Sequence, residues 1–284
     1  MTHFSDRLAA RVRRFGPTCI GLDPHAALLP RALVDGLPPT ADPAYRVAAA
    51  AAAERFCAEV VAIAADRVAA VKPQVAFFEA LGAPGVAALE RVCAAARAAG
   101  LPVVLDAKRG DIGSTAEAYA HAALDDAGPT GADAVTLSPW LGPESIAPFL
   151  RRTPEKGLFL LVRTSNPGAL AWQGAAGAVA DWIASQPDRG DCGLGAVGAV
   201  VGATLPGEAA SWRARMPHAW ILVPGYGAQG GTRDDVAALR RPDGLGALVV
   251  SARGVLFPPG GADAGADWAA GVRQRADAFA ADLR

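Results

Sequence analysis

The sequence predicts a single-domain α/β protein, a (β/α)8 TIM barrel that takes up residues 1–284. Eight short apolar runs alternate with longer, alanine-rich amphipathic segments along almost the whole chain. A length of 284 residues is also ordinary for one such barrel. A doubly wound open sheet is the main alternative, but no Gly-x-Gly-x-x-Gly follows the first apolar run and no change of composition marks a second domain.

The apolar runs are the expected strands, and the segments between them are the expected helices. The strands are predicted at residues 18–22, 69–72, 102–106, 134–137, 158–163, 195–201, 220–224 and 247–251. The helices are predicted at residues 45–66, 85–99, 114–124, 143–149, 175–185, 207–216, 232–239 and 265–283. Ser5 is predicted to cap a short helix ahead of the first strand. The stretches 186–193 and 258–265 are expected to be surface loops.

Charge and composition restrict the classes of partner. The formal net charge is −1, which provides no electrostatic footprint for nucleic acid or anionic lipid, so we expect a small-molecule substrate and neither of those partners. Glu54, Arg55 and Glu59 interrupt the longest apolar region, so we expect no membrane-spanning helix. Because no secretory apolar segment opens the chain, we expect a cytoplasmic location.

The positions of the cysteines and histidines predict neither disulfides nor a metal site. The four cysteines lie far apart and form no Cys-x-x-Cys pair, so we interpret them as reduced thiols in the core. The four histidines are equally scattered, and their spacing suggests neither a zinc site nor a Ser-His-Asp arrangement.

A pattern of three charges, Asp-x-Lys-x-x-Asp, ends the third apolar run. Side chains on a strand repeat every two residues, so Asp106 and Lys108 are expected to point the same way as a coupled acid and amine. Gly110 and Gly113 are expected to turn the chain, so Asp111 could serve a different site, such as a partner's. Taken alone, the pattern also fits a solvated ion pair at a strand end.

Polar residues also end other predicted strands, and the carboxyl ends of barrel strands converge on one pocket. Taken singly, each residue has a simpler explanation. Asp23 could be a turn residue, Lys72 could bury its apolar stem while its ammonium reaches solvent, and Arg253 could be a surface cation. Their occurrence together at strand ends favours a single site. The glycine-dense segment 225–231 and the guanidinium of Arg253 fit an anion site. This segment could also act as a lid, with Gln229 reaching the ligand.

Four motifs give the chain a resemblance to a known family. They are Val-Lys-Pro-Gln-Val-Ala-Phe-Phe-Glu at 71–79, Asp-Ala-Lys-Arg-Gly-Asp-Ile-Gly-Ser-Thr at 106–115, Thr-Ser-Asn-Pro-Gly-Ala at 164–169 and Pro-Gly-Tyr-Gly-Ala-Gln-Gly-Gly at 224–231. With these motifs the chain resembles the longer bacterial branch, type 2, of the orotidine 5'-phosphate decarboxylases over essentially its whole length. The resemblance implies decarboxylation of orotidine 5'-phosphate to UMP and CO2 in de novo pyrimidine biosynthesis, with no metal and no organic cofactor.

The resemblance also implies a role for each matching residue. Lys108 would protonate C6 of the pyrimidine, and Asp106 would lie beside the substrate carboxylate. Asp111 and Thr115 would enter the site of the neighbouring subunit, so the expected active unit is a homodimer with shared sites. The remaining matches would bind substrate, namely Lys72 and Asp23 at the ribose, Ser165 at the pyrimidine, and Gln229 and Arg253 at the phosphate.

Two other functions fit parts of the same pattern. Metal-dependent sugar-phosphate lyases and decarboxylases of the same barrel group also look like carriers of Asp-x-Lys-x-x-Asp. Their second strand typically supplies an acid, whereas Lys72 stands there in this chain and opposes a metal by its charge. The other alternative is a non-catalytic barrel that binds a phosphate-bearing ligand, in which the Asp and Lys pairs would have no obvious purpose.

Overall fold

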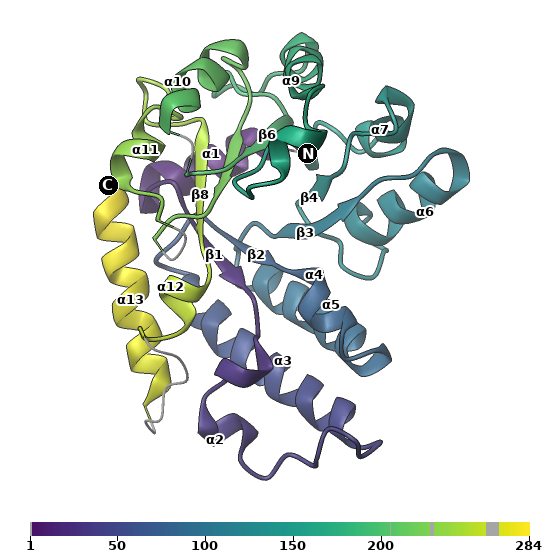
Figure 1. Ribbon diagram of the computed structural model, residues 1–284, viewed down its shortest axis with the longest axis vertical. Coiled ribbons are helices and arrows are strands. Elements are labelled where there is room, and N and C mark those ends of the chain that lie inside the picture. Colours follow the sequence, from purple (N-terminus) through teal and green to yellow (C-terminus); the bar gives the residue numbers. More distant parts are fainter. Residues whose placement is uncertain (1, 205, 228–229, 260–266) are drawn as a thin grey trace.

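Eight parallel strands form a barrel with helices around it, in a computed structural model that describes residues 2–204, 206–227, 230–259 and 267–284 (Figure 1). The hydrogen-bonded order is β2-β1-β8-β7-β6-β5-β4-β3. Isolated parallel bridges pair Val71 with Val103 and Gln74 with Asp106, which joins the two end strands. The predicted (β/α)8 fold class is therefore confirmed.

All eight predicted strands are present, with ends that differ from the prediction by three residues at most. They are β1 (Thr18–Leu22), β2 (Ala70–Pro73), β3 (Val104–Arg109), β4 (Ala134–Leu137), β5 (Gly157–Arg163), β6 (Val197–Val201), β7 (Ile221–Pro224) and β8 (Ala247–Ser251). Their side chains alternate between the barrel interior, as at Cys19, and the layer of helices outside, as at Ile20. This alternation also directs Lys72, Asp106 and Thr136 inward, because Ala70, Val104 and Ala134 face the interior.

The predicted helices are also found around the barrel. They are α3 (Tyr45–Ala64), α5 (Ala83–Ala98), α6 (Gly113–Leu124), α7 (Pro143–Leu150), α9 (Ala176–Ser185), α10 (Pro206–Arg215), α11 (Arg233–Ala237) and α13 (Trp268–Leu283). The first two residues predicted for the last helix, 265 and 266, lie outside the described residues. In the part of the chain that is described, no helix is long and apolar enough to cross a membrane.

Short helices that the sequence did not predict follow four of the strands. They are η1 (Ala26–Leu28) and α2 (Arg31–Val34) after β1, α4 (Val75–Glu79) after β2, α8 (Ala169–Trp172) after β5 and α12 (Arg253–Leu256) after β8. They belong to the segments that leave the carboxyl ends of the strands, where a barrel places its site.

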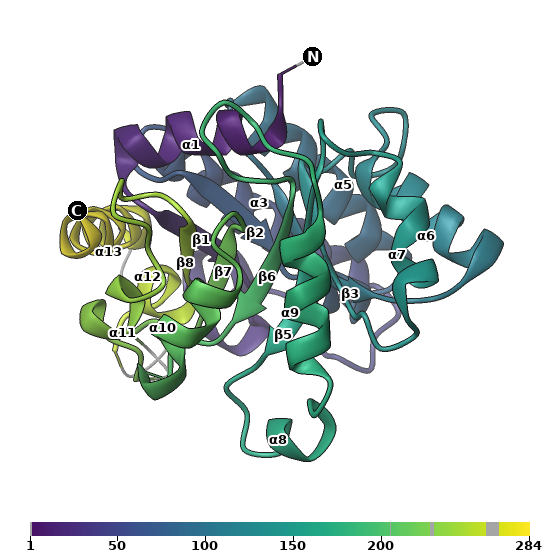
Figure 2. The same ribbon diagram turned by 90° about the horizontal axis from the view of Figure 1, so that it is seen from above.

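The first helix, α1 (Phe4–Phe15), closes the amino-terminal end of the barrel and lies at the opposite end of the molecule from α8 (Figure 2). Phe4, Leu8 and Val12 belong to the same buried cluster as the barrel-interior side chains, and the ring of Phe4 meets that of Phe159 edge to face. The predicted cap was wrong. His3 is the N-cap and accepts a hydrogen bond from the Ser5 N–H, whereas the Ser5 hydroxyl is buried and donates to the Gly195 carbonyl at 2.8 Å.

The four cysteines are free and buried, as the sequence predicted. Burial raises the pKa of the Cys19 thiol to about 12, because the thiolate would lose its hydration there. These side chains act as small apolar residues of the core.

Candidate active site

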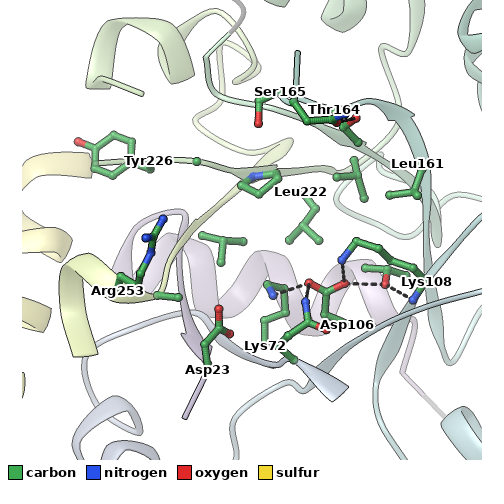
Figure 3. A pocket seen from close by; sticks show the side chains of 18 residues that line it. Asp23, Lys72, Asp106, Lys108, Leu161, Thr164, Ser165, Leu222, Tyr226 and Arg253 are labelled. Atoms are coloured by element: carbon green, nitrogen blue, oxygen red, sulfur yellow. Dashed lines mark hydrogen bonds and ion pairs between the residues drawn. The ribbon is translucent and has the colours of Figure 1, made fainter. Parts of the chain in front are cut away.

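A pocket of about 350 Å³ opens at the carboxyl ends of the strands (Figure 3). Its volume lies in the range of sites for small ligands. Strand ends and the segments after them supply its polar lining. Six of the residues predicted from the sequence come together there: Asp23, Lys72, Asp106, Lys108, Ser165 and Arg253.

Asp106 is the centre of the polar network in this pocket. Its Oδ2 accepts hydrogen bonds from Lys72 Nζ at 2.6 Å and from Gln74 Nε2 at 2.9 Å. Its Oδ1 accepts from Lys108 Nζ at 2.5 Å and from Thr136 Oγ1 at 2.9 Å. Two of these four donors are ammonium groups, and charge-assisted bonds of this kind are the stronger ones.

The two lysines keep this buried carboxylate ionised. Burial acts to raise the pKa of Asp106, but the positive charges of Lys72 and Lys108 outweigh it, and the pKa lies well below its ordinary value. Burial acts to lower the pKa of Lys72, yet the charges of Asp106 and Asp23 hold it above its ordinary value. The pocket therefore contains fixed charges of both signs at neutral pH.

Lys108 reaches the pocket from an irregular piece of backbone. Its φ is +47°, and no other non-glycine residue of the described chain has a positive φ. Conformations of this kind are strained and concentrate at functional sites. The pairing register between β3 and β4 shifts between Leu105 and Arg109. Asp106 and Lys108 do lie together, as predicted, but through this shift and not through the regular strand alternation that the prediction assumed.

Asp23 presents an acceptor that the described residues leave unused. Its Oδ1 is buried and has no hydrogen-bond partner among them. Burial raises the pKa of Asp23, and the attraction of Lys72 offsets this only in part. Because buried polar atoms are normally paired, this oxygen fits a site for a ligand hydroxyl.

Ser165 and Arg253 lie on other sides of the pocket. Ser165 follows β5 and faces Asp106 across the pocket, whereas Arg253 begins α12 near Asp23 (Figure 3). Gly202 allows the Ser165 segment to approach β6, since a Cβ there would lie 2.9 Å from the Ser165 Cβ and 3.0 Å from its backbone nitrogen.

Three predicted residues are not among those that line this pocket. Asp111 is partly exposed, and one carboxylate oxygen accepts a hydrogen bond from the Ile112 N–H at 2.8 Å. Thr115 is exposed in the first turn of α6. Gln229 lies outside the described residues. Arg109, for which the sequence predicts no role, does not line the pocket either and pairs with Glu79.

Sequence reasoning missed Gln74, Thr136 and Tyr226 as pocket residues. Gln74 lies two positions after Lys72, so the period of the strand could have placed both on one side. Thr136 is the one polar residue of the run 134–137, which was a usable signal. Tyr226 was not selected by itself, although it lies in the segment 225–231 that was expected to fit an anion site. Its hydroxyl donates to Asp282 of α13, and no local pattern could indicate that contact.

Comparison with known proteins gives a consistent family. The model described as "Orotidine 5'-phosphate decarboxylase / HUMPS family" matches residues 16–263. The chain is 43% identical to orotidine 5'-phosphate decarboxylase of Roseiflexus castenholzii, covering 100% of this chain and 99% of that one. The enzyme of the same name from Rhodopirellula baltica is 43% identical, with 90% of this chain and 89% of that one covered.

Solved structures agree with these relatives. A putative orotidine 5'-phosphate decarboxylase from Streptomyces avermitilis superposes with a TM-score of 0.82 at 38% identity, covering 100% of this chain and 95% of that one. The OMP decarboxylase of Leishmania donovani superposes with a TM-score of 0.74 at 36% identity, covering 98% and 99% of the two chains.

Proposed function

The chain belongs to the orotidine 5'-phosphate decarboxylase / HUMPS family, and from this we propose that it converts orotidine 5'-phosphate to UMP and CO2 in pyrimidine biosynthesis. The observation that carries the proposal is the Asp106 carboxylate held between the ammonium groups of Lys72 and Lys108 at 2.6 and 2.5 Å. A simple binding pocket has no need for such an arrangement of buried charge.

The chemistry requires a cation at C6. When the bond between C6 and the carboxylate breaks, the electron pair stays on C6 and CO2 leaves. The pyrimidine provides no electron sink for that pair, so a nearby ammonium must stabilise the developing charge. Lys108 then transfers a proton from Nζ to C6, which gives UMP, and regains a proton from water.

Asp106 and Lys72 support this step. Asp106 binds and orients the Lys108 ammonium, and it lies beside the substrate carboxylate, whose departure relieves repulsion between the two anions. The substrate itself is held by other residues of the pocket. Asp23 and Lys72 bind the ribose hydroxyls, Ser165 binds the pyrimidine, and Arg253, together with Gln229, binds the phosphate through its planar guanidinium.

The active unit in this proposal is a homodimer with shared sites. Asp111 and Thr115 lie outside the pocket of their own chain and would complete the pocket of a second copy. Exposed apolar side chains support an interface at this place, since Ile112 follows Asp111 directly and the exposed Trp140 and Leu141 follow β4, the strand paired with β3. A cytoplasmic location and the absence of nucleic-acid partners remain predictions from the sequence.

The metal-dependent alternative within the same barrel group is tested by a chelator. Lys72 Nζ and Lys108 Nζ already neutralise Asp106, so turnover is expected to need no divalent cation. The enzyme is dialysed against EDTA and assayed with and without added Mg²⁺. The assay follows the loss of the orotate absorbance of the substrate, orotidine 5'-phosphate. Unchanged decarboxylation under both conditions is expected. A rate that falls with EDTA and returns with Mg²⁺ would support the alternative, and no decarboxylation at all would contradict the proposed function.

A further inference from the structure

Thr136 connects the parts of the catalytic segment that must be held in register. It lies on β4 and is 1% exposed. Its Oγ1 accepts hydrogen bonds from the backbone N–H groups of Ala107 and Lys108, both at 3.0 Å. The same hydroxyl donates to Asp106 Oδ1 at 2.9 Å. A hydroxyl offers one donor and two acceptor positions, so all three are used on one three-residue segment.

The two N–H bonds coincide with the irregular backbone at Lys108. Successive N–H groups point to the same side when the chain enters the left-handed region, and together they form a small concave site for an oxygen. At Lys108, where φ is +47°, that oxygen is Thr136 Oγ1. The register shift between β3 and β4 lies at this place as well, so the bonds stabilise the conformation from which the Lys108 side chain extends.

We propose that Thr136 is a positioning residue, which fixes the left-handed backbone of Lys108 and orients Asp106 so that the ammonium and the carboxylate meet the substrate in one geometry. The kinetic test of this inference rests on the proposed function. Its structural test rests only on the contacts of Thr136 with residues 106–108. Thr136 acts through Asp106 and Lys108 and does not itself react. Removing its oxygen would leave the carbon framework of the barrel interior in place and release the segment that carries both charges.

The test compares Thr136→Val, which keeps the shape and removes the oxygen, with Thr136→Ser, which keeps the oxygen. Because a displacement of about 1 Å in a catalytic group can cost about 100-fold in rate, Thr136→Val is expected to lower kcat by about 30- to 100-fold. Its KM is expected to stay within about 3-fold, since the groups assigned to ribose and phosphate remain, and Thr136→Ser is expected to stay within about 3-fold of the wild-type kcat.

Thr18→Val is the matched control. Thr18 is a fully buried strand threonine on β1, and its hydroxyl bonds the Phe15 carbonyl and the Ala69 N–H, away from the pocket. The Thr18→Val substitution is expected to lower the unfolding temperature without changing kcat per folded site. The proposal fails if Thr136→Val keeps its kcat, if Thr136→Ser is as impaired as Thr136→Val, or if Thr18→Val loses as much kcat. If Thr136→Val does not fold, Thr136→Cys, with a weaker acceptor, replaces it under the same criteria.

A crystal structure of Thr136→Val separates this proposal from the proposed function. If the wild-type protein does not consume orotidine 5'-phosphate, the proposed function is wrong, and the structure alone judges Thr136. A φ at Lys108 that leaves the left-handed region supports the positioning role. A φ that stays near +47°, with Lys108 Nζ still at Asp106 Oδ1, overturns it.

Discussion

Lys72 and Lys108 bind the same carboxylate but differ in what else they can reach. The side chain of Lys72 is 6% exposed, whereas that of Lys108 is 46% exposed and faces the pocket. Burial restricts Lys72 to contacts within the pocket wall, namely the Asp106 carboxylate and, in the proposed function, the ribose. Lys108 has room for its ammonium to approach a substrate carbon, which is why the proton transfer is assigned to Lys108.

Replacing Lys108 by alanine should therefore abolish turnover in a protein that still folds. Loss of a general acid typically costs about 10²- to 10⁴-fold, so kcat for Lys108→Ala is expected to fall by about 10³-fold or more. Steady-state assays and circular dichroism measure the two parts of the claim. Lys156→Ala is the control, because Lys156 pairs with Asp126 away from the pocket and should retain wild-type activity. Near-normal turnover by Lys108→Ala would refute the assignment.

Ionisation of Asp23 should lower the free energy of unfolding as the pH rises, because the pKa of Asp23 is raised in the folded state. The folded protein then binds more protons than the unfolded chain between the ordinary carboxyl pKa of about 3.9 and the raised folded value, so the free energy of unfolding falls across that window with increasing pH. Asp23→Asn carries no charge and lacks this fall. Relative to wild type, the variant should therefore become more stable as the pH rises from 4 to 8, while it loses substrate affinity.

Urea unfolding of both proteins at the two pH values measures this difference. Asp35→Asn, which changes an exposed carboxylate, is the control and should show no comparable gain with pH. A difference between Asp23→Asn and wild type that does not change with pH would contradict a raised pKa of Asp23 in the folded protein.

The longer elements could be predicted from the sequence, and the short ones could not. Strands and long helices repeat their apolar residues often enough to show a period, whereas α2, α8 and α12 have four residues each and show none. The register shift at Lys108 was also not predictable. It depends on the hydroxyl of Thr136 on the neighbouring strand, and a local pattern contains no information about that contact.

The loop after β7 is expected to affect substrate binding through the contacts of Tyr226. Tyr226 is the second residue of the loop, forms a bridge with Gly231, donates its hydroxyl to Asp282 and packs its ring on Phe279 of α13. Burial and the Asp282 carboxylate raise the pKa of Tyr226, so the hydroxyl stays protonated and keeps donating. Tyr226→Phe loses that bond, worth about 1 kcal/mol or more, and should raise KM by about 5-fold.

The loss of affinity should depend on the phosphate, because the proposed phosphate ligand Gln229 follows Tyr226 by three positions in the sequence. Calorimetric titration is expected to show weaker binding of UMP to Tyr226→Phe and unchanged binding of uridine. Tyr45→Phe, on α3 and outside the pocket lining, is the control. Equal effects on both ligands would mean that Tyr226 acts on the whole pocket and not through this loop.

At the scale of the whole molecule, the barrel gathers residues from position 23 to position 253 into one pocket, and the convergence rule for strand ends was sufficient to predict this gathering. The same rule could not place Asp111 and Thr115, because it concerns a single chain. Gly110 and Gly113 indicated only that the backbone turns away from Asp106 and Lys108. The proposed function places Asp111 in the pocket of a second molecule, and this placement is tested by mixing chains.

Mixed dimers test the shared site directly. Lys108→Ala and Asp111→Ala homodimers should both be inactive, since each of their sites lacks one residue. In a hybrid, one site lacks both residues and the other has both. With random exchange, half of the dimers are hybrids with one intact site of two, so activity should return to roughly a quarter of wild type. The double variant is the control: its hybrids with wild type contain no intact site, so adding it should reduce wild-type activity below simple dilution. If co-purification of differently tagged chains shows exchange and activity does not return, Asp111 does not act across the interface.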